Sequence, residues 1–179
     1  MAKAKKLPSG RKAALRVVTF GVCAACDPRI DKASRDRTTN IIETIAGIIA
    51  EKVTMPDGAG VNVVWSPVLI DGEKQADIVA RRFVDSNVDA VVCTPDTWAF
   101  PQLSLMSLLG QLPADTPVNI TCGNSGPKPG VVYAHAVTGA LAQEAKNKKS
   151  SAFDKIAIFL ISPCLLYTSD AADELDGVD

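Results

Sequence analysis

Residues 15–23 read LRVVTFGVC, an apolar, β-branched run without the three-to-four-residue spacing of a helix. Runs of this kind are typical of parallel strands that are buried on both faces. The same character recurs at 61–65, 88–93, 118–121 and 156–161. The sequence therefore predicts five buried strands.

Helical patterns separate these runs. Residues 38–51 place isoleucines on one face, and 73–84 repeat an amphipathic spacing. Two further helices are predicted over 101–109 and 130–145. Right-handed crossovers between strands make neighbouring strands parallel. We therefore expect an α/β domain of the doubly wound, flavodoxin-like type, with a parallel sheet of about five strands and helices on both faces.

Composition places the chain in the soluble globular class, with 47% hydrophobic residues. Its formal net charge of -1 provides no long-range attraction to nucleic acid or to an anionic membrane. Residues 1–14 are basic and lack the apolar core of a signal peptide, so we expect a flexible arm. No apolar stretch is long enough to span a membrane, and the expected location is the cytoplasm, with free thiols.

The end of the chain has a different character from the rest. Residues 164–174 read CLLYTSDAADE, which resembles the in-frame translation of a sequencing-library adapter. The alternative is an ordinary acidic C-terminus. On the adapter interpretation, residues 15–163 are the domain of a longer, truncated protein and 164–179 are an adapter-derived tail.

Ligands of this fold bind beyond the carboxyl ends of the strands, which directs attention to the loops there. The loop after the first strand carries Asp27, Arg29 and Asp31. The planar guanidinium of Arg29 is suited to clamping an oxygen-rich ligand. A surface salt bridge from Arg29 to Asp27 or Asp31 is equally consistent with the sequence.

The loop after the third strand contains Asp96 and Trp98. An aromatic ring on such a loop can present an apolar face to a sugar ring or a base. The alternative is that Trp98 packs under the loop as part of the core. The sequence leaves both open.

The loop after the fourth strand, 122–130, is rich in glycine and proline and contains Asn124 and Lys128. A glycine-rich turn before a helix can bind an anion. Two prolines remove backbone donors, however, and neither a Walker A motif nor a dinucleotide-binding fingerprint is present, so an interface loop is at least as consistent.

Cys23 and Cys26 form a CxxC motif, which redox enzymes place at a helix N-terminus. Here the motif closes a strand, and no second pair or nearby His supports a zinc site. The sequence favours incidental packing of two small residues. It also shows no pair of carboxylates suited to acid–base catalysis.

Taken in order, these loops resemble the N-terminal domain of the L-fucose isomerase family. The matching features are Asp-Pro-Arg at 27–29, Thr-Pro at 94–95 with the nearby Trp98, and PGVVY at 129–133. The resemblance covers nearly all of the chain before Cys164. Two departures are a shorter first loop and a Trp98 placed one residue late, so the sugar remains open between fucose, arabinose and another pentose.

The resemblance implies a cytoplasmic aldose–ketose isomerase, hexameric at full length, that moves protons between C1 and C2 through an enediol. It implies a divalent metal, typically manganese, held by later domains, and no catalytic residue or metal ligand in this chain. The N-terminal domain would form oligomer contacts and wall the substrate site, with Arg29 and Trp98 binding the sugar. Further contributors expected from the same loops are Asp27, Asp96, Asn124 and Lys128.

Two other hypotheses belong to different classes. One is a non-catalytic module that binds a small molecule, or regulates, on a flavodoxin-like scaffold. The other is a thiol redox protein that uses Cys23 and Cys26.

Overall fold

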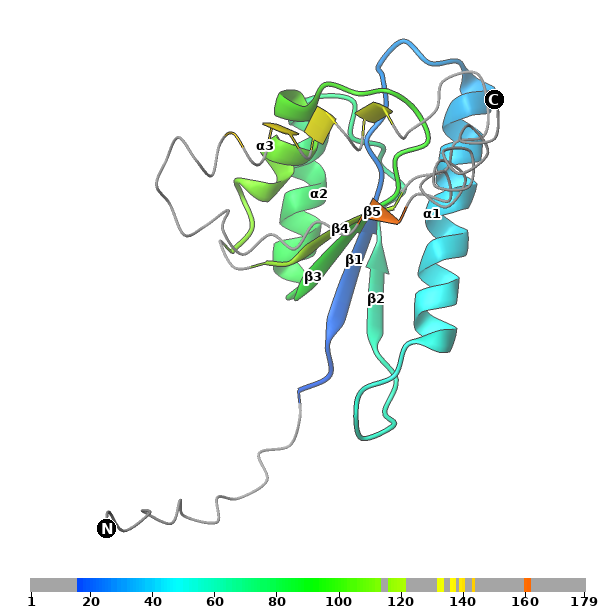
Figure 1. Cartoon of the computed structure of the whole chain (residues 1–179), viewed down its shortest axis with the longest axis vertical. Coiled ribbons are helices and arrows are strands. Elements are labelled where there is room, and N and C mark those ends of the chain that lie inside the picture. The colour runs from blue at the N-terminus through cyan, green and yellow to red at the C-terminus, as the bar shows by residue number, and fades with distance from the viewer. Residues whose placement is uncertain are drawn as a thin grey trace, which may run out of the picture.

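The computed structural model describes residues 16–113, 116–121, 132–133, 136–137, 139–140, 143 and 160–161. Strands and helices alternate along the chain, as the sequence predicts (Figure 1). Their order is β1 (Thr19–Cys23), α1 (Lys32–Lys52), β2 (Asn62–Trp65), α2 (Glu73–Asp85), β3 (Ala90–Cys93), the 3-10 helix η1 (Pro101–Leu103), α3 (Leu105–Leu109), β4 (Val118–Thr121) and β5 (Leu160–Ile161).

The strands form one five-stranded sheet in the order β2-β1-β3-β4-β5. Every neighbouring pair is parallel, with Phe20 of β1 opposite Val63 of β2 and Ala90 of β3. Along the chain, strands are added to one side of β1 and then to the other, so the switch point of the sheet lies between β1 and β3. Doubly wound folds of this type bind ligands at that point. The predicted flavodoxin-like fold is confirmed.

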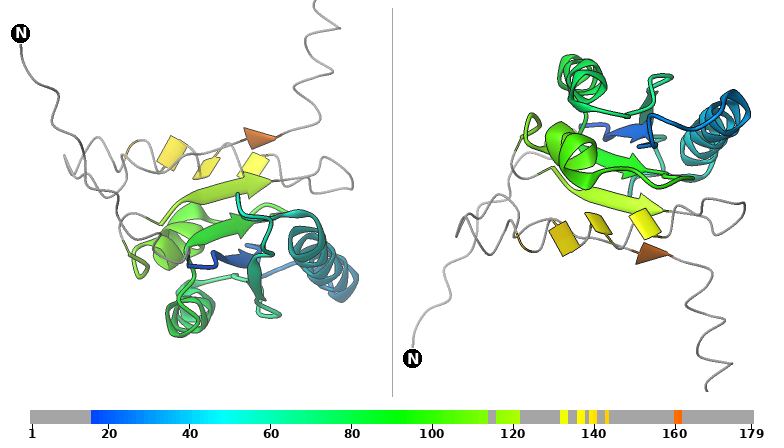
Figure 2. Two further views of the ribbon diagram at one scale, coloured as in Figure 1. Left: turned by 90° about the horizontal axis from the view of Figure 1, so that it is seen from below. Right: turned by 90° about the horizontal axis from the view of Figure 1, so that it is seen from above.

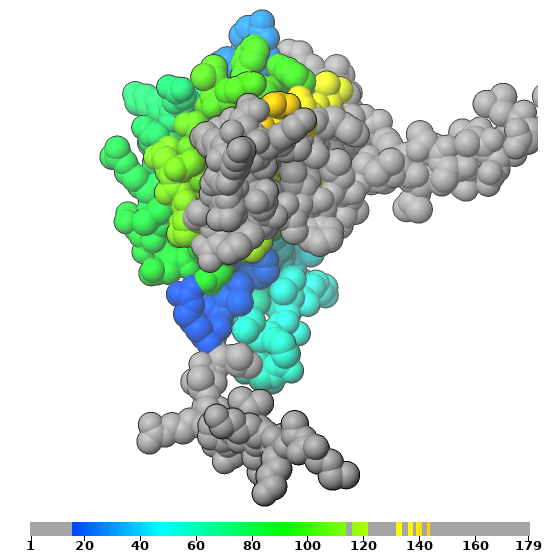
Figure 3. Space-filling model, turned by 60° about the vertical axis from the view of Figure 1, so that its left-hand side comes forward, coloured from blue at the N-terminus to red at the C-terminus, as the bar shows by residue number. Residues whose placement is uncertain are grey.

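Helices cover both faces of the sheet because successive strand residues point to opposite sides. Val22 packs with Ile42 of α1, whereas Cys23 packs on the other side with Val79 and Phe83 of α2. Figure 2 views the sheet from its ends, with α1 on one side and α2 and α3 on the other. The latter two lie side by side and are green in Figure 3.

The first helix begins at Lys32, six residues before the amphipathic pattern at 38–51. The side chain of Asp31 accepts a hydrogen bond from the Ser34 backbone N–H at 2.7 Å. An aspartate at this position satisfies a helix donor that would otherwise lack a partner. The early start places Arg35 and Arg37 on the helix, close to the strand-end loops.

The predicted helix over 101–109 is interrupted at Ser104, which separates η1 from α3. The Ser104 hydroxyl lies 2.6 Å from the carbonyl oxygen of Phe100 and donates to it. It also contacts the Tyr133 hydroxyl at 2.9 Å. Serine side chains that bond nearby backbone compete with helix continuation, which accounts for the break.

Other predicted elements agree in place with small shifts at their ends. The first strand is paired from Thr19, where its partner β2 begins with Asn62. The described residues of the predicted helix over 130–145 are helical, and the predicted last strand is observed at Leu160–Ile161. Within the described part of the chain, no helix is long and apolar enough to cross a membrane.

Several sequence predictions fall outside the described residues. They concern the basic arm at 1–14, the tail at 164–179, and the loop residues Asn124 and Lys128.

Candidate functional site

The loops that follow β1, β2 and β3 meet at the carboxyl edge of the sheet. The Cys26 backbone N–H donates to the Ile70 carbonyl oxygen at 3.1 Å, and Ile70 donates back to Ala24 at 2.9 Å. The Thr94 backbone N–H donates to the Cys23 carbonyl oxygen at 2.8 Å. Backbone contacts therefore hold the three loops together at the switch point of the sheet.

Each of these three loops contributes an aspartate that is paired with an arginine at the start of α1 or just before it. The six residues define the carboxyl-edge ion pairs. They are Arg29–Asp27, Arg35–Asp71 and Arg37–Asp96, with N–O distances of 2.7, 2.9 and 2.6 Å.

Arg29 forms the ion pair with Asp27 that the sequence offered as one alternative. Its guanidinium donates to both carboxylate oxygens of Asp27, at 2.9 and 2.7 Å. This hydrogen bonding raises the pKa of Arg29. The Arg29 side chain is nevertheless 74% exposed, whereas that of Asp27 is 8% exposed. Asp27 thus fixes the direction of the Arg29 guanidinium, which remains largely exposed to solvent.

The Arg37–Asp96 pair is more enclosed. The Asp96 side chain is 3% exposed, against 40% for Arg37. Arg37 contacts Asp96 through Nε, and its Nη2 atom is buried without a hydrogen-bond partner among the described residues. Asp96 therefore serves the loop as a buried anchor, and its carboxylate does not face an open site.

Trp98 is half-buried and packs against the core cluster on the α2 side of the sheet. Its ring meets Phe100 edge-on, with 6.4 Å between centroids and 80° between planes. Phe100 is 43% exposed. Trp98 therefore packs against the core, as one of the two sequence alternatives predicts. Part of its surface stays exposed on the loop at the carboxyl edge.

The sequence prediction missed Arg35, Arg37 and Asp71. Arg35 donates to the Pro28 carbonyl oxygen at 3.0 Å as well as to Asp71, and so ties α1 to two loops. The signal was present as Asp31 three residues before Ser34, a spacing typical of a helix start. A helix that starts there places both arginines at the edge where the loops meet.

A family comparison now identifies the domain. The model of the L-fucose isomerase first N-terminal domain matches residues 17–151. The chain belongs to the L-fucose isomerase family. Relatives within this family include the L-fucose isomerases of Streptococcus pneumoniae strains Hungary19A-6, CGSP14 and ATCC BAA-255 / R6. Each is 29% identical over 108 residues, which is 60% of this chain and 18% of the relative.

A divalent metal site in this L-fucose isomerase family domain would need several ligand side chains in one place. Among the described residues, no three His, Cys, Asp or Glu side chains are grouped so that they could hold an ion. The carboxylates nearest the strand ends are already paired with arginines. The described part of the domain therefore does not fit a divalent metal site.

The cysteines of the domain do not have the properties of a redox pair. Cys23 and Cys26 are buried in core clusters on opposite faces of the sheet. Burial raises the pKa of Cys26 to about 12. The pKa of Cys23 is raised mainly by a hydrogen bond with Cys93 and also by burial. Reactive cysteines have lowered pKa values, so the structure opposes the thiol redox hypothesis.

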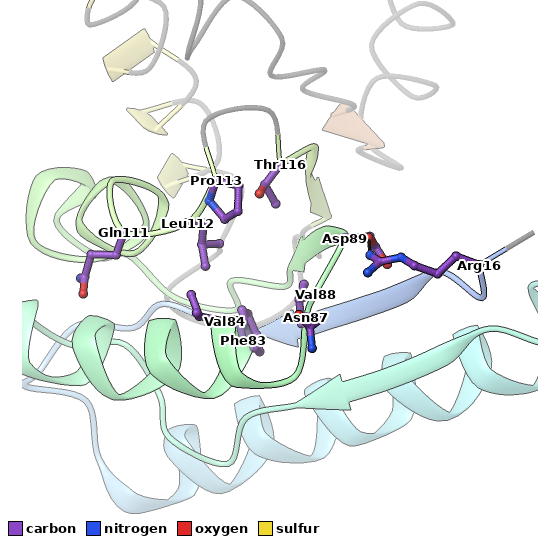
Figure 4. Close-up of a pocket in the computed structure, with 10 residues that line it drawn as sticks. All are labelled: Arg16, Phe83, Val84, Asn87, Val88, Asp89, Gln111, Leu112, Pro113 and Thr116. Carbon is purple, nitrogen blue, oxygen red and sulfur yellow. Dashed lines mark hydrogen bonds and ion pairs between the residues drawn. The ribbon is translucent and has the colours of Figure 1, made fainter.

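A pocket of about 610 Å³ lies at the opposite, amino-terminal edge of the sheet (Figure 4). Asp89 and Arg16 form an ion pair on its wall, and Val84 and Leu112 supply apolar lining. In doubly wound folds ligands bind at the carboxyl ends of the strands. The carboxyl edge, with Arg29 and Trp98, is therefore the stronger candidate site of this family domain.

Proposed function

We propose that this chain is the first N-terminal domain of an aldose–ketose isomerase and that its carboxyl edge forms part of the wall of the sugar site. The family match over residues 17–151 carries the proposal. The chain spans 18% of the length of its curated relatives, so the reaction belongs to the longer protein.

The arrangement of Arg29 and Trp98 supports the sugar-binding role. Their loops are in contact, since the Asp27 backbone N–H lies 3.4 Å from Thr97 Oγ1. A guanidinium provides planar paired donors for hydroxyl oxygens, and an aromatic ring provides an apolar face for sugar C–H groups. Asp27 fixes the direction of the Arg29 guanidinium. Packing against the core limits the motion of the Trp98 ring.

The chemistry at C1 and C2 is assigned to residues outside this domain. A divalent metal, with manganese as the first choice, would polarise the sugar oxygens when bound by later domains. The role of the present domain is to bind, orient and enclose the sugar. We further propose that the full-length protein is a homo-oligomer, with a hexamer as the expected state, in which this domain walls the site of a neighbouring subunit.

The test uses the full-length protein encoded by the natural gene. Conversion of L-fucose and L-arabinose to their ketoses is measured with Mn²⁺ and with a chelator, and light scattering gives the oligomeric state. We expect metal-dependent conversion, with kcat/KM lowered about ten- to a hundred-fold by Arg29→Ala or Trp98→Ala. The control is Arg81→Ala, which changes an exposed arginine on α2.

A full-length protein that converts no aldose would overturn the proposal. Calorimetry with the same sugars then separates the remaining alternative. Sugar binding without conversion would support the non-catalytic binding module.

A further inference from the structure

The loop between β3 and η1 is tied to its surroundings immediately before Trp98. Asp96 accepts a hydrogen bond from Arg37 Nε at 2.6 Å. Thr97 Oγ1 accepts from the Asp27 backbone N–H at 3.4 Å and donates to the Trp98 carbonyl oxygen at 3.2 Å. The two residues that precede Trp98 thus connect its loop to α1 and to the loop after β1.

The same loop is also tied immediately after Trp98. Ala99 is fully buried in the core. The Phe100 carbonyl oxygen accepts from Ser104 Oγ at 2.6 Å, and Ser104 in turn contacts the Tyr133 hydroxyl at 2.9 Å. Trp98 is therefore bracketed by anchors on both sides, and its backbone position depends on them.

Among these anchors, the Arg37–Asp96 contact is the ionic one. The Asp96 carboxylate is almost wholly enclosed, and removal of the partner of a buried charge is strongly destabilising. Arg37 reaches Asp96 with Nε while its buried Nη2 has no acceptor in the described part of the chain. The Arg37 guanidinium is thus positioned to pair with Asp96, although one of its N–H donors is left without an acceptor among the described residues.

We propose that Arg37 is a positioning residue for the sugar site: through Asp96 it fixes the loop that presents Trp98. Arg37 itself does not bind the sugar. This role rests on the proposed function, in which Trp98 binds the sugar. The coupling between Arg37 and Trp98 can be measured separately from any activity.

The first experiment uses the whole 179-residue chain with Trp65→Phe, which leaves Trp98 as its single tryptophan. The emission maximum and acrylamide quenching of Trp98 are compared in Arg37→Gln, Arg37→Lys and the parent. We expect Arg37→Gln to shift emission to the red and to raise quenching about two-fold while far-UV circular dichroism stays unchanged. Arg37→Lys keeps a cation for Asp96 and is expected to restore most of the parent signal.

The matched control is Lys32→Gln, which also removes an ion pair from the first turns of α1. Its partner Asp36 is exposed, so Trp98 should not respond. A folded Arg37→Gln chain with the parent's Trp98 signal would overturn the proposal. If Arg37→Gln does not fold, Asp96→Asn decides, because it removes the same charge pairing in nearly the same shape. An unchanged Trp98 signal in Asp96→Asn contradicts the positioning role, and a red shift supports it.

The second experiment measures kinetics of the full-length protein. Arg37→Gln should raise KM about ten-fold and change kcat less than about three-fold, because a misplaced Trp98 weakens sugar binding. Arg37→Lys should recover KM. An unchanged KM in a folded Arg37→Gln enzyme would contradict the role. If the full-length protein converts no sugar, the proposed function fails, and the fluorescence comparison still decides whether Arg37 positions Trp98.

Discussion

Asp27 and Arg29, two residues apart, are joined by a two-pronged ion pair at the carboxyl edge of the sheet. Arg29 Nε lies 2.9 Å from Asp27 Oδ1, and Arg29 Nη2 lies 2.7 Å from Oδ2. The Arg29 backbone N–H also donates to Oδ1, at 2.8 Å. One enclosed carboxylate therefore organises both the turn of the loop and the direction of its exposed cation.

This geometry predicts that the two partners contribute unequally to stability. Asp27→Ala should lower the free energy of unfolding by about 0.5–1.5 kcal/mol, because it removes the buried acceptor that pairs with the Arg29 backbone N–H and holds the turn of the loop. Arg29→Ala should leave the urea midpoint almost unchanged, because the Arg29 side chain is largely exposed. Urea unfolding of both variants is the measurement. Equal effects of the two substitutions would contradict the asymmetry.

Two glycines should respond to alanine with opposite signs. A Cβ at Gly21 would lie 2.9 Å from Phe83 Cε2 and 2.9 Å from Val88 Cγ1, whereas one at Gly47 has nothing within 4 Å. Gly21→Ala should destabilise by about 1–3 kcal/mol through overpacking between β1 and α2. Gly47→Ala, inside α1, should stabilise by about 0.5–1 kcal/mol. Thermal and urea unfolding provide the comparison, and a stabilised Gly21→Ala would show that the core at β1 yields to the added methyl group.

The buried Tyr133 hydroxyl should contribute to the attachment of its helix to α3. It contacts Ser104 Oγ and accepts from the Leu105 backbone N–H at 3.4 Å. Tyr133→Phe should lower the free energy of unfolding by about 1–2 kcal/mol. The double variant with Ser104→Ala should cost less than the sum of the single changes, because both remove the same contact. Strict additivity would contradict this coupling.

The native thiols should be unreactive. With a pKa of about 12, Cys26 has a thiolate fraction on the order of one in ten thousand at about pH 8. In a chain with Cys122→Ser and Cys164→Ser, Ellman's reagent should label the native protein at least about a hundred-fold more slowly than the urea-unfolded protein. Rapid native labelling, or a Cys23–Cys26 disulfide formed under mild oxidation, would revive the redox hypothesis.

Stability should decrease in alkaline solution. Burial raises the pKa of Cys26 from 9.0 to about 12, so in this range the unfolded chain releases a proton that the folded chain keeps. The free energy of unfolding must then fall as pH rises, and the raised pKa values of Cys23 and Tyr133 act in the same direction. Urea unfolding between about pH 8 and pH 11 measures the slope. Cys26→Ala should make it shallower, and a slope that the substitution does not change would argue against a contribution from Cys26.

The fold was largely predictable because its signals are local. The run at 15–23 has no helical period, and helical patterns alternate with similar runs. Element ends were less predictable. The helix that carries the pattern at 38–51 already begins at Lys32 because Asp31 caps it. The helix predicted over 101–109 breaks at Ser104, whose hydroxyl bonds to the backbone of Phe100 and to the side chain of Tyr133.

The candidate site was only partly predictable because its contacts join residues far apart in the chain. Arg29 and Trp98 were identified from the loops that carry them, and their position at the carboxyl edge follows from the parallel sheet. The partners Arg35 and Arg37 were missed. Their roles depend on contacts with Asp71 and Asp96, which lie 36 and 59 residues away.

By itself, the sequence determined the alternation of buried strands and amphipathic helices, the parallel sheet, and the loops on which polar and aromatic side chains gather. These properties arise from the period of apolar residues, which neighbouring positions set. Only the tertiary structure decided that Arg29 pairs with Asp27, that Trp98 packs against the core while remaining half-buried, and that Cys23 and Cys26 lie on opposite faces. Such outcomes depend on which of several chemically suitable partners the packed chain brings within bonding distance, and on how deeply it buries them.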